Sequence, residues 1–276
     1  MGVWILAGVT FREASRKKLV WMALLAGGAF LALFGTGLHF QVKDFATRLP
    51  SIMVRRQAMS TLLLMGLYAA DALVVMMAVL TSVDTLSGEI ASGSIQAVAT
   101  KPIRRAQLVF GKWLGLAGML TIYVALMVGG TATVAYLIGG ATVRHLAAGM
   151  ALIWLESLLL LSVTLFFGTT FSTLTNGVLT LGLHGAAFLG GWIEVAGASS
   201  DSPRAVTVGI VASLVMPSEA LWRRAAYEMQ SPLVAAVGFS PFSGASTPSP
   251  VMVGYAAVYL LLFLLAALYR FNRRDL

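Results

Sequence analysis

Six stretches of this sequence are each long and apolar enough to cross a lipid bilayer, and they constrain the fold more than any other feature. A helix needs about 20 mostly apolar residues to span a hydrocarbon core of about 30 Å. Lipid gives irregular backbone no hydrogen-bond partners, so the crossing segments should be helical. The chain is therefore expected to be an all-α, polytopic membrane protein with six transmembrane helices, at residues 19–38, 62–83, 108–138, 146–168, 177–196 and 251–269.

The composition agrees with a membrane protein and narrows the partners. Of the 276 residues, 58% are hydrophobic and 11% are charged, whereas about 25% of the residues in a soluble domain are charged. The net charge of +8 could suit nucleic acid, but in so apolar a chain the anionic headgroups of the bilayer are the expected partner. The chain has no cysteine, which excludes disulfides, thiolate metal sites and cysteine nucleophiles.

The spans are expected to form one transmembrane domain over residues 1–276, with an interfacial elbow helix at 1–18. The stretch TFREASRKKLVW combines four basic residues with Phe11, Leu19 and Trp21. Such a helix suits the headgroup layer and leads into the first span.

The longest connection, residues 197–250, is expected to be an outer segment with re-entrant or interfacial helices. Within it, residues 205–216 are apolar but too few to cross the bilayer. Pro217 should end that piece, and Ser218 with Glu219 can begin a new helix.

An even number of spans places both termini on one side of the membrane. With cytoplasmic termini, the inner loops and ends carry eleven basic residues and the outer ones eight, including Arg223 and Arg224. This is only a weak bias toward positive charge inside, so the orientation needs other support.

Two acidic residues fall near the middle of predicted spans: Asp71 in the second and Glu156 in the fourth. A central acidic residue disfavours insertion by about 2.5–3.5 kcal/mol, so such residues usually face the helix bundle or a wet cavity. Two interpretations stay open, namely hydrogen bonding between helices and the handling of a substrate or proton.

The fifth span carries polar and small residues on one helical face, within an arc of about 80°. Such a stripe either lets another helix approach closely or lines a pathway. If it lines a pathway, replacing Gly191 with Leu should block transport and leave assembly intact. The stripe consists of Asn176, Thr180, His184, Ala187, Gly191 and Glu194.

Catalytic, metal and nucleotide signatures are missing from the sequence. The three histidines, His39, His145 and His184, lie on different segments, and there is no H-E-x-x-H or G-x-S-x-G motif. In FGKW, Trp113 stands where a phosphate-binding loop needs Ser or Thr. We expect a chain that is not an enzyme and binds no cofactor itself, so any ATP and Mg²⁺ belong to a partner.

The connection at residues 84–105 has the features of a short amphipathic helix followed by a turn. Acidic residues lie near its start and Lys101 near its end, which suits the helix dipole. Pro102 then forces a turn, and the following basic residues, with Trp113, suit the headgroup region. A helix over 84–101 that can dock into a partner's groove is expected, with an apolar face formed by Leu86, Ile90, Gly93 and Ala97.

This connection resembles the cytoplasmic coupling region of ATP-binding-cassette (ABC) type-2 permeases. The family pattern is an acidic residue, Gly-Thr, an apolar run, Pro, a basic pair and Gly-Lys. Ser94 stands here in place of the usual Thr. The matching residues are Glu89, Gly93, Pro102, Arg104, Arg105, Gly111 and Lys112.

Three further stretches extend the resemblance over essentially the whole chain: TFREASRKKLVW, the part from FLGGWIEVAG to MPSEALWRRAAYE, and the ending YRFNRRDL. Together they are similar to the branch of these permeases associated with multicopper-enzyme maturation. The sequence itself has no Cys or Met cluster that would indicate copper.

The resemblance implies a multi-pass permease of the cytoplasmic membrane, with both termini and residues 84–105 in the cytoplasm. It implies two permease copies, expected as a homodimer with twelve spans, and two cassette ATPase subunits. The implied ATPase-coupling interface is Glu89, Ile90, Gly93, Ser94, Ala97, Pro102, Arg104 and Arg105.

In such permeases, spans two and five usually border the translocation pathway. The resemblance therefore places Asp71 and the stripe of the fifth span at the pathway, and the central acid of the fourth span is a further candidate. The candidate pathway residues are Asp71, Glu156, Asn176, Thr180, His184, Gly191 and Glu194.

The sequence therefore predicts the permease subunit of an ATP-driven transporter, expected to be an exporter. One alternative is an ion-coupled secondary carrier that uses Asp71, Glu156 and His184 without ATP. Another is a membrane component that signals or transmits force, without transport, to an outer protein partner through residues 197–250.

Overall fold

A computed structural model describes residues 2–49, 51–93, 105–230 and 247–273, and within these ranges every regular element is a helix. Six helical segments are long and apolar enough to cross a membrane. This confirms the all-α fold with six transmembrane helices. The crossing segments are α2 (Lys18–Arg48), α3 (Ile52–Ser82), the third span made of α6 (Arg105–Val124), η1 (Ala125–Gly129) and α7 (Gly130–Gly139), α8 (Leu146–Gly168), α9 (Thr173–Ser199) and α13 (Pro250–Asn272).

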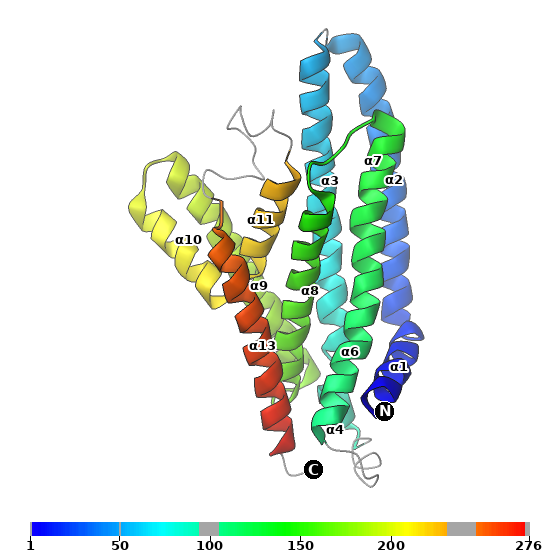
Figure 1. Ribbon diagram of the computed structural model, residues 1–276, viewed down its shortest axis with the longest axis vertical. Coiled ribbons are helices and arrows are strands. Elements are labelled where there is room, and N and C mark those ends of the chain that lie inside the picture. Colours follow the sequence, from blue (N-terminus) through cyan, green and yellow to red (C-terminus); the bar gives the residue numbers. More distant parts are fainter. Residues whose placement is uncertain (1, 50, 94–104, 231–246, 274–276) are drawn as a thin grey trace.

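The first two spans are longer than the hydropathy indicated. Helices α2 and α3 have 31 residues each, and they form a hairpin that projects beyond the other helices at one end (Figure 1). The prediction ended the first span at residue 38 and began the second at 62. It missed the projecting part because the residues there are too polar to score as a span, although they continue the helices.

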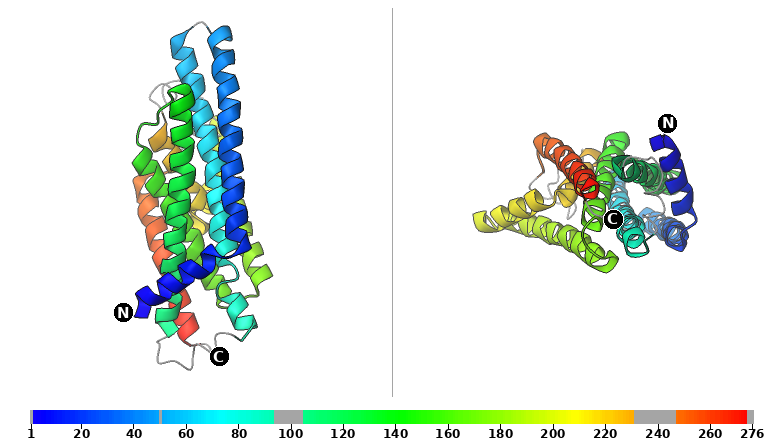
Figure 2. Two further views of the ribbon diagram at one scale, coloured as in Figure 1. Left: turned by 90° about the vertical axis from the view of Figure 1, so that its right-hand side faces the viewer. Right: turned by 90° about the horizontal axis from the view of Figure 1, so that it is seen from below.

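The N-terminal helix α1 (Gly2–Ser15) lies across the foot of the bundle rather than along it (Figure 2). It packs against α6 at two glycines. A Cβ on Gly111 would lie 2.6 Å from Leu6 Cβ, and a Cβ on Gly115 would lie 2.6 Å from the carbonyl oxygen of Ala7. The pair is therefore a small-x-x-x-small contact that lets the two backbones approach closely.

The segment between the fifth and sixth spans contains α10 (Pro203–Val215) and α11 (Ser218–Met229), joined at an angle of 106°. Each is about 20 Å long or less, at 1.5 Å per residue, so neither crosses a bilayer alone. The helix break falls at Pro217, as the sequence indicates. Helix α10 packs along α9, and this pair reaches away from the other helices when the molecule is seen from below (Figure 2).

Helices α3 and α8 form the centre of the subunit. In each of these two spans, 61% of an apolar stretch of 18 residues is buried inside the subunit, compared with 17% in α2 and 22% in α13. Helix α11 packs on α8 and also contacts α3 and α9. The start of α1, the short helix α4 (Ser87–Ala91) and the end of α13 all lie at the same end of the bundle, opposite the α2–α3 turn (Figure 1). We call this the α4 end.

Candidate functional site

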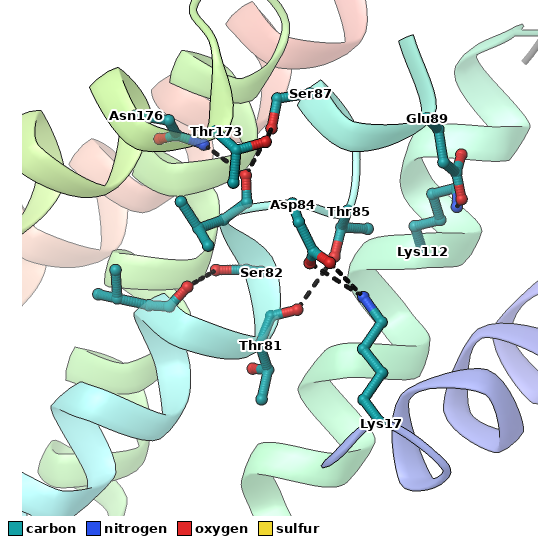
Figure 3. A network of polar contacts seen from close by, with 12 residues as sticks. Lys17, Thr81, Ser82, Asp84, Thr85, Ser87, Glu89, Lys112, Thr173 and Asn176 are labelled. Carbon is teal, nitrogen blue, oxygen red and sulfur yellow. Dashed lines mark hydrogen bonds and ion pairs between the residues drawn. The ribbon is translucent and has the colours of Figure 1, made fainter. Parts of the chain in front are cut away.

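Polar side chains from five parts of the chain meet at the α4 end (Figure 3). They come from the α1–α2 turn, the α3–α4 turn, helix α4, the third turn of α6 and the first turn of α9. We call this group the α4 network. Its core residues are Lys17, Asp84, Ser87, Glu89, Lys112, Thr173 and Asn176.

The first connection joins the α3–α4 turn to the start of α2. The Lys17 ammonium donates to both carboxylate oxygens of Asp84, at 2.9 and 3.1 Å. The two side chains are 24% and 38% exposed. An ion pair this exposed contributes about 0–1 kcal/mol to stability, so its main effect is to fix the position of the turn.

The second connection joins α4 to the third span through an ion pair between Glu89 and Lys112. The Lys112 side chain is only 7% exposed, whereas that of Glu89 is 26% exposed. The prediction that Lys112 is one of the basic headgroup anchors is corrected by this placement. Its charge is turned inward, where an ammonium needs a partner. Trp113, expected to face the headgroups, instead donates its indole N–H to Ser162 on α8, at 3.0 Å.

The third connection joins the start of α4 and the residue after α3 to α9. The hydroxyl groups of Ser87 and Thr173 are 2.8 Å apart. Asn176 donates from Nδ2 to the carbonyl oxygens of Val83 and Thr164, both at 3.0 Å. The Asn176 side chain thus links the carbonyl group that follows α3 to a carbonyl group near the end of α8.

Helix α4 is shorter than predicted. It ends at Ala91, and Gly93 has a φ of +70°, in the left-handed region that commonly ends a helix. The expected continuous helix over 84–101 is therefore wrong at Gly93, and Gly93 does not extend the apolar face formed by Leu86 and Ile90. Four of the predicted ATPase-coupling residues, Ser94, Ala97, Pro102 and Arg104, lie outside the described residues. Arg105 begins α6.

A second polar group lies inside the bundle, between α3, α8, α9 and α11. Asp71 and Glu156 are 5% and 1% exposed, and their carboxyl groups adjoin each other. Glu219 from α11 interacts electrostatically with both. We call these three residues the acidic cluster. Both predicted residues face the protein interior, as expected from their places in the sequence.

The polar stripe of α9 faces α11 over the half of the helix that follows Thr180. His184 Nδ1 lies 2.9 Å from the hydroxyl oxygen of Ser218. Further along, Arg223 donates from Nη2 to Glu194 Oε2 at 2.9 Å, and both side chains are buried. Thr180 is also buried, and its hydroxyl lies 3.4 Å from Asn176 Oδ1. The stripe therefore packs within the subunit, which matches the close-packing interpretation.

Gly191 provides room for α11. A Cβ at this position would lie 2.9 Å from Glu219 Cγ. The Gly191→Leu substitution would therefore displace α11, and it does not separate transport from assembly.

The burial of Glu219 and Arg223 inside the bundle was not predicted from the sequence. Arg223 was counted among the outer basic residues, but its side chain is buried and paired. The available signal was the segment SEALWRRAAYEM, in which charged residues recur between Ala and Leu at helical spacing. Such a pattern also suits a surface helix, so only the packing of α11 in the bundle shows that these charged side chains are buried.

The described residues contain no group of three or more His, Asp or Glu side chains arranged to hold a metal ion. The fold and these two polar groups define a multi-pass membrane protein whose helices are joined by polar contacts at one end and around the bent α10–α11 pair. The sequence matches the model of the family described as ABC-2 family transporter protein over residues 4–276. The chain therefore belongs to this family, as a membrane permease subunit of ABC transporters. A search of curated proteins found no match.

Membership of this family implies a separate ATPase partner and a transport role without a nucleotide site in the permease itself. It confirms the prediction of a permease subunit and of a multi-pass membrane protein.

Proposed function

We propose that the chain is the permease of an ATP-driven exporter and that its α4 end receives the ATPase. The observation that carries this proposal is the α4 network, because it ties one short segment at the end of the bundle to three separate spans. A push on α4 reaches α6 through Glu89 and Lys112, α2 through Asp84 and Lys17, and α9 through Ser87 and Thr173. Packed elements joined in this way move together rather than deforming independently.

In this proposal the α4 end is cytoplasmic, and so are both termini. Two copies of the chain form a homodimer that works with two ATPase subunits. The exposed side of α9 supports the pairing, since a Cβ added to Gly182 or Gly185 would meet no atom within 4 Å, and these glycines would allow a second helix to approach. Because the chain has no cysteine, a single Gly182→Cys substitution tests the dimer by cross-linking.

The decisive experiment reconstitutes the permease with its cassette ATPase in liposomes. Glu89→Gln should lower permease-stimulated ATP hydrolysis or recovery of the complex, because the Lys112 ammonium loses its partner and α4 loses its attachment to α6. The matched control is Glu13→Gln, an exposed acid on α1, which should behave as wild type. Equal activity of Glu89→Gln and wild type in both measurements counts against the proposal.

The same liposomes test the two alternatives. Substrate movement without the ATPase supports the ion-coupled carrier that uses Asp71, Glu156 and His184. A permease that stimulates ATP hydrolysis but moves nothing supports a component that transmits force to an outer protein partner. Accumulation of substrate inside inverted vesicles, only with ATP and ATPase, supports export.

We also propose that the chain belongs to the branch associated with multicopper-enzyme maturation, on the sequence resemblance alone. If so, deleting the gene should lower the copper content of a multicopper enzyme in the same cell. Copper content equal to that of the parent strain would remove this assignment and leave the permease function untouched.

A further inference from the structure

The interior of the bundle holds more acidic groups than its basic groups can neutralise. Asp71, Glu156, Glu194 and Glu219 are all buried, and Arg223 is the cation buried with them in the part of the chain that the structure describes. Its Nη2 donates to Glu194 at 2.9 Å and to the Ser213 hydroxyl at 3.2 Å. Arg223 also interacts with Glu219, so Asp71 and Glu156 are left without a cationic partner among the described residues.

Their oxygen atoms also lack hydrogen-bond donors. Within the described chain, neither carboxyl oxygen of Glu156 has a hydrogen-bond partner, and Oδ1 of Asp71 has none. A buried carboxylate without partners is strongly disfavoured, and two adjoining carboxylates cannot both stay ionised. The Asp71 and Glu156 carboxyl groups therefore need a positive charge small enough to fit between them.

A proton meets this requirement better than a metal ion does. The described residues contain no set of side chains spaced to hold a metal. A metal ion would need several oxygen ligands around one point, whereas a proton needs only one oxygen and an acceptor beside it. Asp71 and Glu156, whose carboxyl groups adjoin, supply both.

We propose that Asp71, Glu156 and Glu219 form a proton-binding site that holds the re-entrant helix α11 against α3 and α8. With a proton bound between Asp71 and Glu156, the cluster carries one negative charge fewer, and Glu219 packs beside Gly191. When the proton leaves, three carboxylates from three helices repel one another. Helix α11 is the element that can respond, because it is a short helix that is set off from α10 by a bend of 106°.

Other titratable groups face the acidic cluster, and any test must distinguish their titration from that of the cluster. Tyr68 on α3 interacts with all three acids. His184 on α9 contacts Ser218, the residue before Glu219. Glu194 on α9 and Arg223 on α11 form the neighbouring ion pair.

Infrared spectroscopy of the purified permease tests the proposal without any ATPase, so its outcome is distinct from that of the proposed function. A protonated carboxylic acid has a C=O stretching band that a carboxylate lacks and that shifts in D₂O. We expect such a band at neutral pH, its loss at high pH, and its removal or shift in Glu156→Gln. The matched control is Glu228→Gln, an acid on α11 that is paired with Arg224, and it should keep the band.

Hydrogen exchange of the α11 amides measures the response of the helix. After correction for intrinsic exchange, protection of α11 in the wild type should fall by about tenfold per pH unit over the range in which opening releases the proton, and it should level off once the closed form has also lost it. In Glu156→Gln the protection should not depend on pH. His184→Gln should retain the wild-type dependence, since the proposal assigns the proton to the acids.

Several outcomes would overturn the proposal. They are the absence of a carboxylic acid band at every pH at which the protein is folded, the same exchange slope in Glu156→Gln and wild type, and loss of the band on adding Na⁺ or K⁺ at constant pH. If Glu156→Gln does not fold, Asp71→Asn and isotope-labelled Glu and Asp in the wild-type protein provide the same assignment.

Discussion

The α4 network and the acidic cluster treat charge in opposite ways. At the α4 end each acid has its own cation, Asp84 with Lys17 and Glu89 with Lys112. In the interior, adjoining carboxyl groups on α3 and α8 have no cation of their own among the described residues. The paired arrangement fixes one geometry. In our proposal the acidic cluster has a protonated and an unprotonated state, so it can switch between two conformations. The α4 network has one charge state and can only pass on a movement.

The largest effect on stability is expected at the buried ion pair between Arg223 and Glu194. Arg223→Met leaves Glu194 charged and buried, which should lower the free energy of unfolding by about 3–5 kcal/mol. Unfolding in mixed detergent micelles measures this. Adding Glu194→Gln to the same chain should restore most of the loss. Arg224→Met is the control, because Arg224 and Glu228 are partly exposed; an equal loss in both single variants would contradict the prediction.

The Glu89–Lys112 pair should respond asymmetrically. Glu89→Gln leaves a buried ammonium without a counter-charge, and we expect a loss of about 2 kcal/mol. Lys112→Met leaves a carboxylate that is 26% exposed and can be hydrated, so its cost should be smaller. Thermal unfolding of the two variants side by side checks the order. A larger cost for Lys112→Met would mean that Glu89, rather than Lys112, depends on the pair.

The contact that holds α1 on α6 is a test of packing without charge. Gly115→Ala should destabilise the protein by about 1–2 kcal/mol, because the added Cβ would lie 2.6 Å from the Ala7 carbonyl oxygen. Gly118→Ala has only an ordinary contact, 3.8 Å from Phe11, and should be neutral or slightly stabilising because Ala favours helix. Proteolysis of α1 in membranes reports detachment. Equal protection in the two variants would show that the close approach at Gly115 is not required.

Asp84→Asn should have a small effect on stability, below about 1 kcal/mol, and the effect should shrink in high salt. The pair with Lys17 is exposed enough for water to replace it. The measurement is the unfolding midpoint at low and high ionic strength. A loss that does not change with salt would show that Asp84 acts through its hydrogen bonds rather than its charge.

The smallest effect at neutral pH is expected for Glu156→Gln, even though Glu156 is among the most buried charged residues of the described chain. If the acid is protonated, glutamine is a close replacement and stability should hardly change. At higher pH the variant should be the more stable protein, because the wild type then ionises an acid that has no partner. Unfolding measured across pH checks the sign, and destabilisation at every pH would contradict it.

Hydropathy and helix-breaking residues were sufficient to predict the spans and the break before α11. They work because each span must satisfy its backbone locally and because Pro217 interrupts a helix wherever it stands. The central acids Asp71 and Glu156 could be placed facing inward for the same energetic reason.

The partners of these acids could not be predicted. Glu219 and Arg223 lie far along the chain from most of the residues they face, and the segment that carries them looks like a surface helix in sequence. Only the 106° bend turns it into the bundle. The position of the Lys112 side chain was predicted wrongly for a related reason. A lysine near the end of a span usually extends its ammonium group to the headgroups, and nothing in the sequence indicates that Glu89 lies beside it.

The α2–α3 hairpin has a consequence for anything that approaches the opposite side of the membrane. A helix of 31 residues is about 46 Å long, and a hydrocarbon core takes up only about 30 Å of it. The remainder extends into the headgroup layer and past the ends of the other helices. A soluble macromolecule that approaches this face would contact the end of the hairpin first, so the hairpin limits how closely it can approach the bilayer.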